Sequence, residues 1–439
     1  MDLDVNRYEF IGHALHGTGG FRDGRYLVRY PRESEEKYTR RRETAWYASP
    51  LARACDRFSG YLARYRPMRD LNNPLLDSFA DDCNWRGDSL DLFFDHFIFE
   101  AKARGTMLLL VDMPREMPER QDEQIDFRAF PYLVPIHPEQ VSRYELDQRG
   151  KFSTVTIFEI ETELDGRKVR IERTWDTQGW QVKKGEDVIE EGEHGLGVCP
   201  VLIFSETGDF PKEGAFSAIA DISKRLYNAV SELMEISRSQ TFSILAYQIP
   251  PEQAHNFDLR QIAETISTDN MLVHSGEPPS YIQPEAGPAE VYFREIEMLS
   301  KKIDEIGLNV QPPDTTEAGI AMQMRFQMLN AALSAFARRM EDFERRMWDL
   351  VCAWLGMNNT TNINWPKDYS LADMGHELEV LQQMQSVGAP PLYVQEKLKQ
   401  LISLDFTAVQ RDVLDDVLAQ VNEAGHERIE TEEEDEWER

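Results

Sequence analysis

Six side chains of the types that bind metal ions lie close together in the sequence. They are Asp81, Asp82, Asp88, Asp91, Asp95 and His96. Residues four apart share one face of a helix, so Asp91 and Asp95 could offer two carboxylates to one divalent cation, as a metal-dependent nuclease or phosphatase requires. However, the chain has 78 Asp and Glu residues, and an acidic helix face in such a chain is ordinarily solvated surface. We favour the surface role and keep the metal site as the alternative.

A glycine-rich stretch, HGTGG at His16 to Gly20, could cradle a phosphate. It lacks the lysine of a P-loop, and no clear strand precedes it, so a flexible segment is the better interpretation. His194, next to Gly195, is interpreted as a turn residue. The nine histidines do not form a recognisable Ser/His/Asp or Cys/His arrangement. The sequence therefore predicts a protein that is not an enzyme, with no catalytic residue, cofactor or metal.

Composition narrows the class of protein further. The four cysteines are scattered, without the spacing of a zinc site, and are expected to be reduced structural thiols; they are Cys55, Cys83, Cys199 and Cys352. A net charge of -30 argues against a protein that grips nucleic acid through basic side chains. Apolar runs such as Met107 to Val111 are far shorter than a membrane span, and no signal peptide pattern opens the chain. We expect a soluble, non-secreted protein without membrane contact.

The first half of the chain mixes helices and strands. Residues 1–33 are glycine-rich, lack a sustained period and predict an extended arm. Helical periodicity follows from Ser34 to Tyr65, with a break near Pro50, and again from Ser89 to Arg104. The run MLLLVDMP after Gly105 is typical of a buried strand. Residues 130–205 alternate as strands do, and Asp165-Gly166 between two such runs indicates a β-hairpin.

Long helices dominate from Gly214 onward. Phe216 to Tyr247 predicts one helix with apolar residues in heptad spacing: Ile219, Ile222, Leu226, Ala229, Leu233 and Ile236. A short helix at Leu259 to Ile266 and strands at Met271 to His274 and Ser280 to Gln283 are expected next. Ala289 to Leu308 is helical again. The apolar face of this predicted helix would consist of Val291, Ile296, Leu299, Ile303 and Ile306.

The longest predicted helix starts near the capping pair Asp314 and Glu317 and runs to about Trp354. Its heptad seam is Leu329, Leu333, Phe336, Met340, Phe343, Met347, Leu350 and Trp354. The methionines from Met322 to Met347 could line a peptide-binding groove, but core packing explains them more simply. Three further helices are expected at Leu371 to Ser386, Tyr393 to Ile402 and Thr407 to Ala424. Eight acidic residues between Glu427 and Arg439 predict a disordered tail.

The order of these parts resembles the portal, or head-tail connector, proteins of tailed bacteriophages over roughly Glu35 to Ala424. Three stretches carry the resemblance: YTRRRETAWYASPLARACDRFSGYLARYRP, FFDHFIFEAKARGTMLLLVDMP and EHGLGVCPVLIFSETG. They look like the N-terminal helices, the helix and strand, and the closing strand of a portal wing. The family shares architecture rather than residues, so the order of parts carries the resemblance.

The resemblance implies an α+β, predominantly helical fold with portal-like parts. By residue number they are an arm at 1–33, a wing at 34–213 with a β-rich part at 130–205, a first stem helix at 214–249, an α/β clip at 250–284, a second stem helix at 285–308, a tunnel loop at 309–319, a long bracing helix at 320–358, a helical crown at 359–425 and an acidic tail at 426–439. The clip is short and the crown modest compared with the family pattern.

The function implied by the resemblance is mechanical. About 12 copies would form a ring at one capsid vertex of the virion, assembled in the host cytoplasm. Double-stranded DNA would pass through it without sequence specificity during packaging and ejection. The expected partners are the major capsid protein, scaffolding protein, the packaging terminase and a head-tail adaptor. A non-viral cytosolic helical scaffold remains the runner-up, and a nuclease using Asp91 and Asp95 is a weaker alternative.

The resemblance also assigns candidate residues. The DNA-facing tunnel loop would present Gln311, Asp314, Thr315, Thr316 and Glu317, with Lys301 and Lys302 as the nearest basic pair. The stem seam or ring interface would use Ile219, Ile222, Leu226, Leu233 and Ile236. Acidic side chains around the opening would repel the DNA phosphates, so that the duplex slides without lasting contacts.

Overall fold

The computed structural model describes most of the chain. The described residues are 3–31, 33–114, 128–162, 166–241, 244–246, 280–282, 287–308, 319–369, 374–405, 417 and 419–421. They form two compact units that are each built from separate stretches of sequence. The first comprises Met1–Gly12, Leu51–Ser217 and Ile306–Arg439, and the second His13–Pro50 and Ala218–Glu305.

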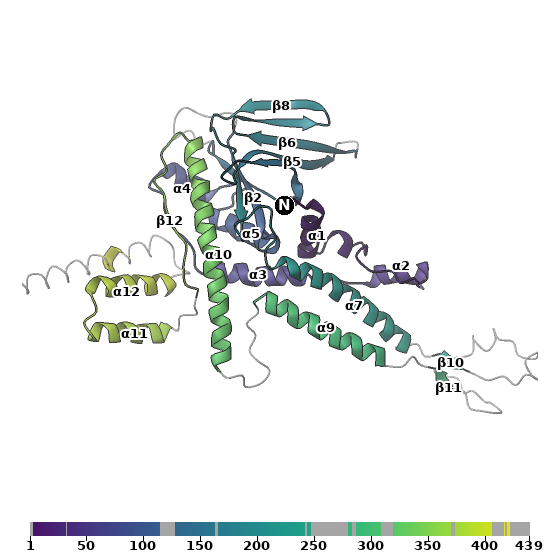
Figure 1. Ribbon diagram of the computed structural model, residues 1–439. Helices are drawn as coiled ribbons and strands as arrows, with labels where there is room; N and C mark the ends of the chain where they lie inside the picture. Colours follow the sequence, from purple (N-terminus) through teal and green to yellow (C-terminus); the bar gives the residue numbers. More distant parts are fainter. Residues whose placement is uncertain are drawn as a thin grey trace, which may run out of the picture. The chain divides into compact units, whose positions relative to one another are not determined.

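Two antiparallel sheets, of three and five strands, form the larger β structure of the first unit (Figure 1). In the smaller sheet, the central strand β2 (Thr106–Asp112) pairs with β3 (Tyr132–Ile136) and β9 (Val201–Ser205). The larger is a meander of β4 (Val141–Leu146), β5 (Phe152–Thr162), β6 (Lys168–Asp176), β7 (Gly179–Lys184) and β8 (Asp187–Glu193). β5 and β6 pair antiparallel as far as Thr162 and Lys168, so the two strands expected on either side of Asp165-Gly166 are present. The β-rich segment is therefore confirmed.

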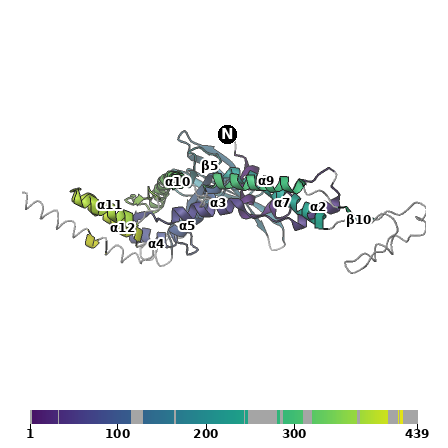
Figure 2. The same ribbon diagram turned by 90° about the horizontal axis from the view of Figure 1, so that it is seen from below.

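The first unit also contains most of the helices. They are α3 (Pro50–Ala63), α4 (Pro74–Asp81), α5 (Leu90–Arg104), α10 (Gly319–Trp354), α11 (Met374–Ser386) and α12 (Pro391–Asp405), with a 3-10 turn η2 (Pro138–Gln140). α11 and α12 pack side by side (Figures 1 and 2). A two-stranded ladder joins β1 (Met68–Asp70) to β12 (Asn362–Asn364). The sequence did not lead us to expect α4, β1 or β12.

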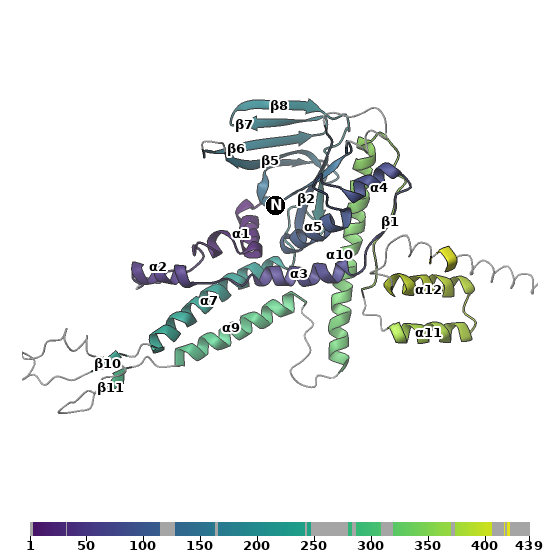
Figure 3. The same cartoon turned by 180° about the vertical axis from the view of Figure 1, so that it is seen from behind.

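The second unit is built around two long helices, α7 (Ser217–Thr241) and α9 (Gly287–Ile306), which lie side by side (Figures 1 and 3). It also contains the 3-10 turn η1 (Gly19–Phe21) and α2 (Glu35–Thr44). Two short strands, β10 (Ile244–Ala246) and β11 (Ser280–Ile282), pair antiparallel. With its helices and antiparallel sheets, the chain has the α+β fold that was predicted.

Local sequence signals explain where helices α2 and α5 begin and where α5 ends. The Ser34 side chain accepts a hydrogen bond from the backbone N–H of Lys37 at the start of α2. Ser89 does the same for Leu92 at the start of α5. Gly105 ends α5 with a φ of 77°, a left-handed conformation that glycine adopts without strain. The next residues, Thr106–Asp112, form a strand that is almost wholly buried, as the apolar run predicted.

The heptad seam of α10 forms part of the core of the first unit. Each seam residue from Leu329 to Leu350 is at most 6% exposed. Phe343 stacks on Phe97 of α5, with ring centroids 5.2 Å apart, and meets Phe204 of β9 edge-on. Burying each such side chain is worth about 1.5–3 kcal/mol. Met340 and Met347 are buried here, as core packing predicts, whereas Met324 and Met328 nearer the start of α10 are 62% and 65% exposed.

Two expectations for the helices were wrong. Residues 1–33 are not an extended arm, because Val5–His16 forms helix α1. Tyr8, Ile11 and Leu15 recur at helical spacing and are buried, a pattern that the neighbouring glycines obscured. The helix expected to reach Tyr247 ends at Thr241, since Ile244–Ala246 forms a strand paired with Ser280–Ile282.

Several expectations fall outside the described residues. These are the clip helix at 259–266, the strand at 271–274, the tunnel loop at 309–318, most of the helix at 407–424 and the acidic tail at 426–439. The described part of the chain also bears on the membrane prediction. None of its helices combines the length and apolarity that crossing a bilayer would need.

A buried ion pair connects α10 to the β1–β12 ladder. Glu344 of α10 is 0% exposed and accepts a hydrogen bond from Arg69 Nε of β1 at 2.5 Å. The indole nitrogens of Trp348 and Trp365 donate to the same carboxylate at 3.2 and 2.7 Å. Arg69 also pairs with Asp91 at 2.5 Å. The guanidinium of Arg69 and the carboxylate of Glu344 neutralise each other, so removing either one leaves the other charge buried without a partner.

We therefore predict that Arg69→Leu lowers the free energy of unfolding by about 3–5 kcal/mol. Arg66→Leu provides the control, because Arg66 pairs with Asp95 at 2.9 Å while its side chain is 48% exposed. The control should cost about 1 kcal/mol or less. Urea unfolding followed by tryptophan fluorescence measures both variants, and equal small losses would contradict the structural role given to Arg69.

Candidate assembly surface on the second unit

Helix α7 buries a polar face. Ser223, Tyr227 and Ser231 are four residues apart, Asn228 follows Tyr227, and each of the four is at most 3% exposed. We call these four residues the polar face. Buried polar groups cost free energy unless they are hydrogen-bonded, so this face requires partners of complementary polarity.

Residues 13–50, here called the N-terminal segment, supply those partners for Tyr227 and Asn228; the buried hydroxyls of Ser223 and Ser231 make no hydrogen bond within the described residues. Asn228 Oδ1 accepts a hydrogen bond from the backbone N–H of Val28 at 2.8 Å, and Asn228 Nδ2 donates to the carbonyl of Tyr26 at 3.0 Å. The Tyr227 hydroxyl donates to the carbonyl of Phe21 at 3.1 Å. Side chains of α7 thus bind the backbone of a segment about 200 residues earlier in the chain.

An aromatic cluster strengthens the same contact. The rings of Phe21 and Tyr47 stack with centroids 3.9 Å apart, and Tyr227 meets both rings edge-on. Tyr47 donates its hydroxyl hydrogen to the carbonyl of Ala14 at 2.9 Å. The cluster combines burial of large rings with satisfied hydroxyl groups. The N-terminal segment is consequently an integral part of the second unit.

The carboxylate of Glu232 joins three segments. It is 8% exposed, and its two oxygens accept hydrogen bonds from the hydroxyls of Tyr30 in the N-terminal segment and Tyr292 in α9. Burial and the hydrogen bond to Glu232 raise the pKa of Tyr30 to about 12. The hydrogen bond to Glu232 also raises the pKa of Tyr292. Both phenols are therefore held protonated as donors, and Glu232 connects the N-terminal segment, α7 and α9.

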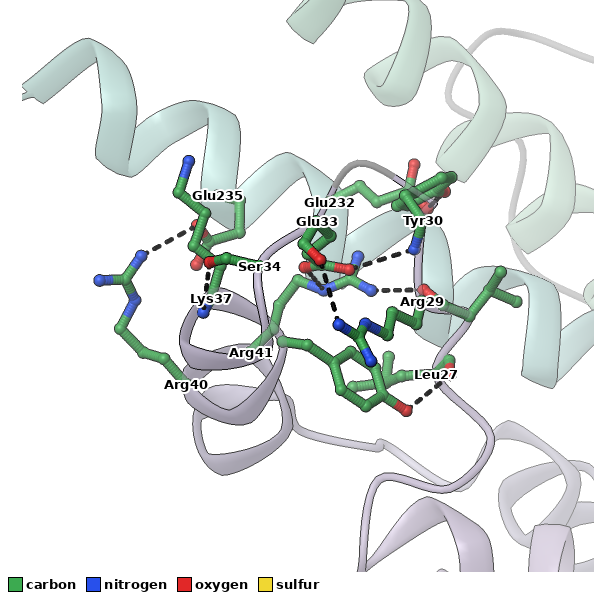
Figure 4. Close-up of polar contacts among 12 residues, drawn as sticks. Leu27, Arg29, Tyr30, Glu33, Ser34, Lys37, Arg40, Arg41, Glu232 and Glu235 are labelled. Carbon is green, nitrogen blue, oxygen red and sulfur yellow. Dashed lines mark hydrogen bonds and ion pairs between the residues drawn. The ribbon is translucent and has the colours of Figure 1, made fainter.

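Arginines of α2 complete this junction (Figure 4). Arg41 is 3% exposed; its guanidinium donates to the carbonyl of Val28 and pairs with Glu33 at 3.1 Å. Arg40 reaches Glu235 of α7 at 3.7 Å. Figure 4 shows Glu232 and Glu235 on α7 facing the N-terminal segment. A basic stretch of the chain thus lies against acidic positions of α7.

The predicted seam of α7 is only partly covered. Ile219 and Ala229 are buried, whereas the remaining members are half-buried: Ile222, Leu226, Leu233 and Ile236. The comparable seam of α10 is buried from Leu329 to Leu350. The same heptad spacing therefore produces a closed core in one helix and a partly open apolar surface in the other.

Helix α9 runs antiparallel to α7. Arg225 pairs with Glu295 at 2.6 Å and Glu232 binds Tyr292, so rising numbers on α7 match falling numbers on α9. Ile303 is buried, but Val291, expected on the inner face, is 65% exposed. Phe293 and Met298 are 59% and 61% exposed. Much of the apolar surface of α9 faces away from α7.

The other candidate residues are placed as follows. Lys301 and Lys302 are exposed on α9, where they pair with Glu297 and Glu305, each at 2.8 Å. The five tunnel-loop candidates lie outside the described residues: Gln311, Asp314, Thr315, Thr316 and Glu317. These placements leave the DNA-facing assignment as a proposal.

Three of the carboxylates that could have bound a metal are neutralised by arginines. Asp91 pairs with Arg69, and Asp95 with Arg66. Asp82 pairs with Arg128. Over the described ranges, no group of three or more His, Cys, Asp or Glu side chains is arranged to hold a metal ion. This geometry does not support the nuclease alternative.

The glycine-rich stretch and the cysteines have structural roles. Gly17 and Gly19 adopt φ values of 62° and 51°, and a Cβ at Gly19 would overlap the ring of His13. His194 directly follows β8, and its Nε2 is 3.0 Å from the carbonyl oxygen of Asp176. All four cysteines are free and buried.

Sequence reasoning missed the polar face and the segment that covers it. The apolar heptad of α7 drew attention to one side of the helix. A second periodic signal was available, since Ser223, Tyr227 and Ser231 are four residues apart. A polar stripe at helical spacing indicates a face that binds backbone groups, but the sequence does not identify the segment that supplies them.

We predict a pH dependence that reports the Glu232 junction. The pKa of Tyr30 is raised from 10.0 to about 12, so its protonated form stabilises the folded chain below about pH 10. This contribution should disappear as the pH rises through the folded pKa. Urea midpoints measured from pH 9 to pH 12 should fall more steeply in the wild type than in Tyr30→Phe. Tyr393→Phe, at a 50% exposed position, is the control; parallel curves for wild type and Tyr30→Phe would contradict the prediction.

The sequence matches no protein-family model and no curated protein. Among solved structures, the chain is similar to a chain of the neck of a native gene transfer agent particle computed with C12 symmetry. That match has 14% identity and a TM-score of 0.46, and covers 80% of this chain and 89% of the other. A chain of the native gene transfer agent virion matches with 13% identity and a TM-score of 0.42, over 77% of this chain and 86% of that one.

A third similar structure is an HK97 family phage portal protein from Corynebacterium diphtheriae. It has 9% identity and a TM-score of 0.37, with 72% of this chain and 92% of that chain covered. The structures similar to this chain therefore include a portal protein, the family that the order of elements predicted.

Proposed function

We propose that the chain is a portal protein of a tailed bacteriophage or phage-like particle, one subunit of a ring at a capsid vertex. The observation that carries the proposal is the partly open apolar seam of α7. Ile222, Leu226, Leu233 and Ile236 are half-buried in the single chain. Apolar residues at heptad spacing favour burial against another helix, and a second copy supplies one.

A head-to-tail interface between copies closes into a ring when its rotation divides a full turn. In the proposed assembly, α7 and α9 are the two stem helices and the segment between them is the clip. The first unit supplies the wing, with its five-stranded meander and the bracing helix α10. Residues 359–425 form the crown. The number of copies, about 12, follows from the family resemblance.

The proposed role is to let double-stranded DNA enter and leave the particle while docking the terminase and then the head-tail adaptor. A chain with a net charge of -30 suits a channel that must not hold phosphates. The loop at 309–319 would face the DNA through Gln311, Asp314, Thr315, Thr316 and Glu317. Lys301 and Lys302 are paired with glutamates on α9, which reduces their attraction for a passing phosphate.

A non-viral helical scaffold is the second candidate function. Long helices and acidic charge suit it equally well, and an unclosed filament or a simple dimer would be its assembly. The two candidates differ in the state of the purified protein. Scaffolds of that kind lack a closed ring with a central opening.

We predict that the purified wild-type chain forms closed rings. Negative-stain electron micrographs should show a central hole, and native mass spectrometry should give one integer multiple of the subunit mass. Filaments, simple dimers or a single subunit at every concentration and salt tried would contradict the portal proposal.

A second prediction concerns the tunnel loop. Replacing two acidic residues together, Asp314→Lys with Glu317→Lys, should increase retention of duplex DNA by the assembled ring, because lysines release counterions on binding phosphates. Each added phosphate contact should steepen the fall of log affinity with log salt by about 0.9. Glu190→Lys with Glu191→Lys on β8 makes the same charge change elsewhere. If both double variants retain DNA equally, the loop does not face the duplex.

A further inference from the structure

The five-stranded meander of the first unit ends in an open edge. Its last strand, β8, pairs with β7 on one side, and no strand of the described chain pairs with its other side (Figure 3). Every residue of β8 is exposed except the half-buried Gly192. An edge strand presents a row of backbone N–H and C=O groups that a further strand can bind. β8 is therefore a position at which the sheet can be extended.

The smaller sheet shows how this chain closes the edges of a sheet. The backbone N–H of Leu133 on β3 donates to the carbonyl of Cys83 at 2.8 Å. On β9, the carbonyl of Ile203 accepts a hydrogen bond from the guanidinium of Arg346 at 3.3 Å. Both outer strands of the smaller sheet thus contact another part of the first unit, whereas β8 remains an exposed edge.

The β8 edge also carries negative charge that its own chain does not fully neutralise. Residues 185–199 contain five carboxylates and neither lysine nor arginine. These carboxylates belong to Glu186, Asp187, Glu190, Glu191 and Glu193. Glu186, Asp187 and Glu193 form no ion pair within the described part of the chain. On α9, by contrast, the exposed Glu297 and Glu305 are each paired with a lysine.

Two exposed aliphatic side chains lie among the acidic ones. Val188 and Ile189 are 47% and 53% exposed. Val188 lies opposite Lys183 of β7, and Ile189 has no counterpart there, because the register of the two strands shifts at this point. Such a β-bulge adds twist to the strand locally. The ladder is regular again over residues 190–193, so an added strand would pair with this stretch and cover the aliphatic pair.

Carboxylates lie on both faces of the sheet at this edge. Glu190 pairs with the buried Val182, and Glu191 follows on the opposite face, because successive side chains of a strand alternate. The next residue, Gly192, lies against the indole ring of Trp180, since a Cβ at Gly192 would be 3.0 Å from the indole nitrogen. An indole ring attracts the charged end of lysine or arginine. A basic side chain beside Gly192 would thus meet an aromatic ring as well as carboxylates.

The charge of the edge selects the kind of strand that fits it. A second copy of β8 would place carboxylates opposite carboxylates, which destabilises a pair of strands. Nucleic acid is repelled in the same way, because its phosphates are negative. Lysine or arginine side chains would instead stand opposite Glu190, Glu191 and Glu193, and opposite charges on neighbouring strands stabilise their pairing.

We propose that the β8 edge binds an extended, basic segment of a partner protein, which adds a strand to the five-stranded meander. Main-chain hydrogen bonds provide the binding in this mode of recognition, and side chains provide the specificity. Here the carboxylates, together with Val188 and Ile189, select a segment that mixes lysine or arginine with aliphatic residues. The site belongs to the first unit alone and does not rest on the proposed ring.

Defined peptides test the proposal without any change to the protein. A fluorescently labelled octapeptide of alternating lysine and valine should bind the full chain in an anisotropy titration. The same peptide methylated at every backbone nitrogen keeps its charge but loses its N–H donors, so it should bind about 10-fold more weakly or worse. An octapeptide with the sequence of residues 186–193 should not bind. Addition of the lysine–valine peptide should slow hydrogen exchange within residues 187–193.

A triple variant of the protein locates the site. Glu190→Gln, Glu191→Gln and Glu193→Gln together should weaken binding of the lysine–valine peptide by about 10-fold, because three contacts between opposite charges are lost. Circular dichroism and urea midpoints should match those of the wild type, since all three side chains are exposed.

The matched control removes the same charge from other strands of the same sheet. Glu145→Gln on β4 is combined with Glu159→Gln and Glu161→Gln on β5. This control should bind the lysine–valine peptide within about 2-fold of the wild type, because exposed charges away from the contact are screened by salt.

Each contrary outcome overturns the assignment. If the lysine–valine peptide fails to bind at about 1 mM, or if its methylated form binds equally well, β8 does not accept a basic strand. Binding of the 186–193 peptide would identify a second copy as the occupant. Equal losses in the two triple variants would place the peptide elsewhere on the acidic surface. A wild-type chain that forms no ring ends the portal proposal but leaves this one standing.

Discussion

The second unit depends on one constraint: the buried amide of Asn228 and the buried hydroxyl of Tyr227 on α7 must find hydrogen-bond partners. An unsatisfied buried amide or hydroxyl costs about 1–3 kcal/mol, comparable to a large part of the stability of a domain. Asn228 and Tyr227 meet this requirement with backbone groups of Val28, Tyr26 and Phe21. Because these contacts fix which side of α7 faces the N-terminal segment, they also decide that Leu226 and Leu233 face elsewhere.

Helices α7 and α10 carry nearly the same apolar spacing but use it differently. The α10 seam is closed by aromatic rings of its own unit, including Phe97 and Phe204. On α7, the neighbouring elements bind the polar face and the side toward α9, and the aliphatic stripe stays half-buried. Heptad spacing thus indicates that a helix has an apolar contact, but it does not identify whether the partner belongs to the same chain or to another copy.

Arginine has a structural role in this acidic chain. Arg41 and Arg104 are 3% and 1% exposed, and Arg69 binds the fully buried Glu344. Arg69 and Arg66 also neutralise Asp91 and Asp95, the pair that first suggested metal chemistry. Clustered carboxylates in a sequence therefore carry little information about catalysis until their neighbours in space are known, since an arginine from a distant segment changes their chemistry.

Periodicity and caps in the sequence determined the local elements: the bounds of α5, the hairpin before Lys168, the strand after Gly105 and the seam of α10. These features depend on residues within a few positions of one another, so they can be predicted from the sequence. Only the tertiary structure decided that Val28 covers Asn228, that Arg69 reaches Glu344 and that Ile244–Ala246 leaves its helix to pair with β11. Each of these contacts joins residues far apart in the chain. A single sequence does not show which distant groups form hydrogen bonds or ion pairs with each other.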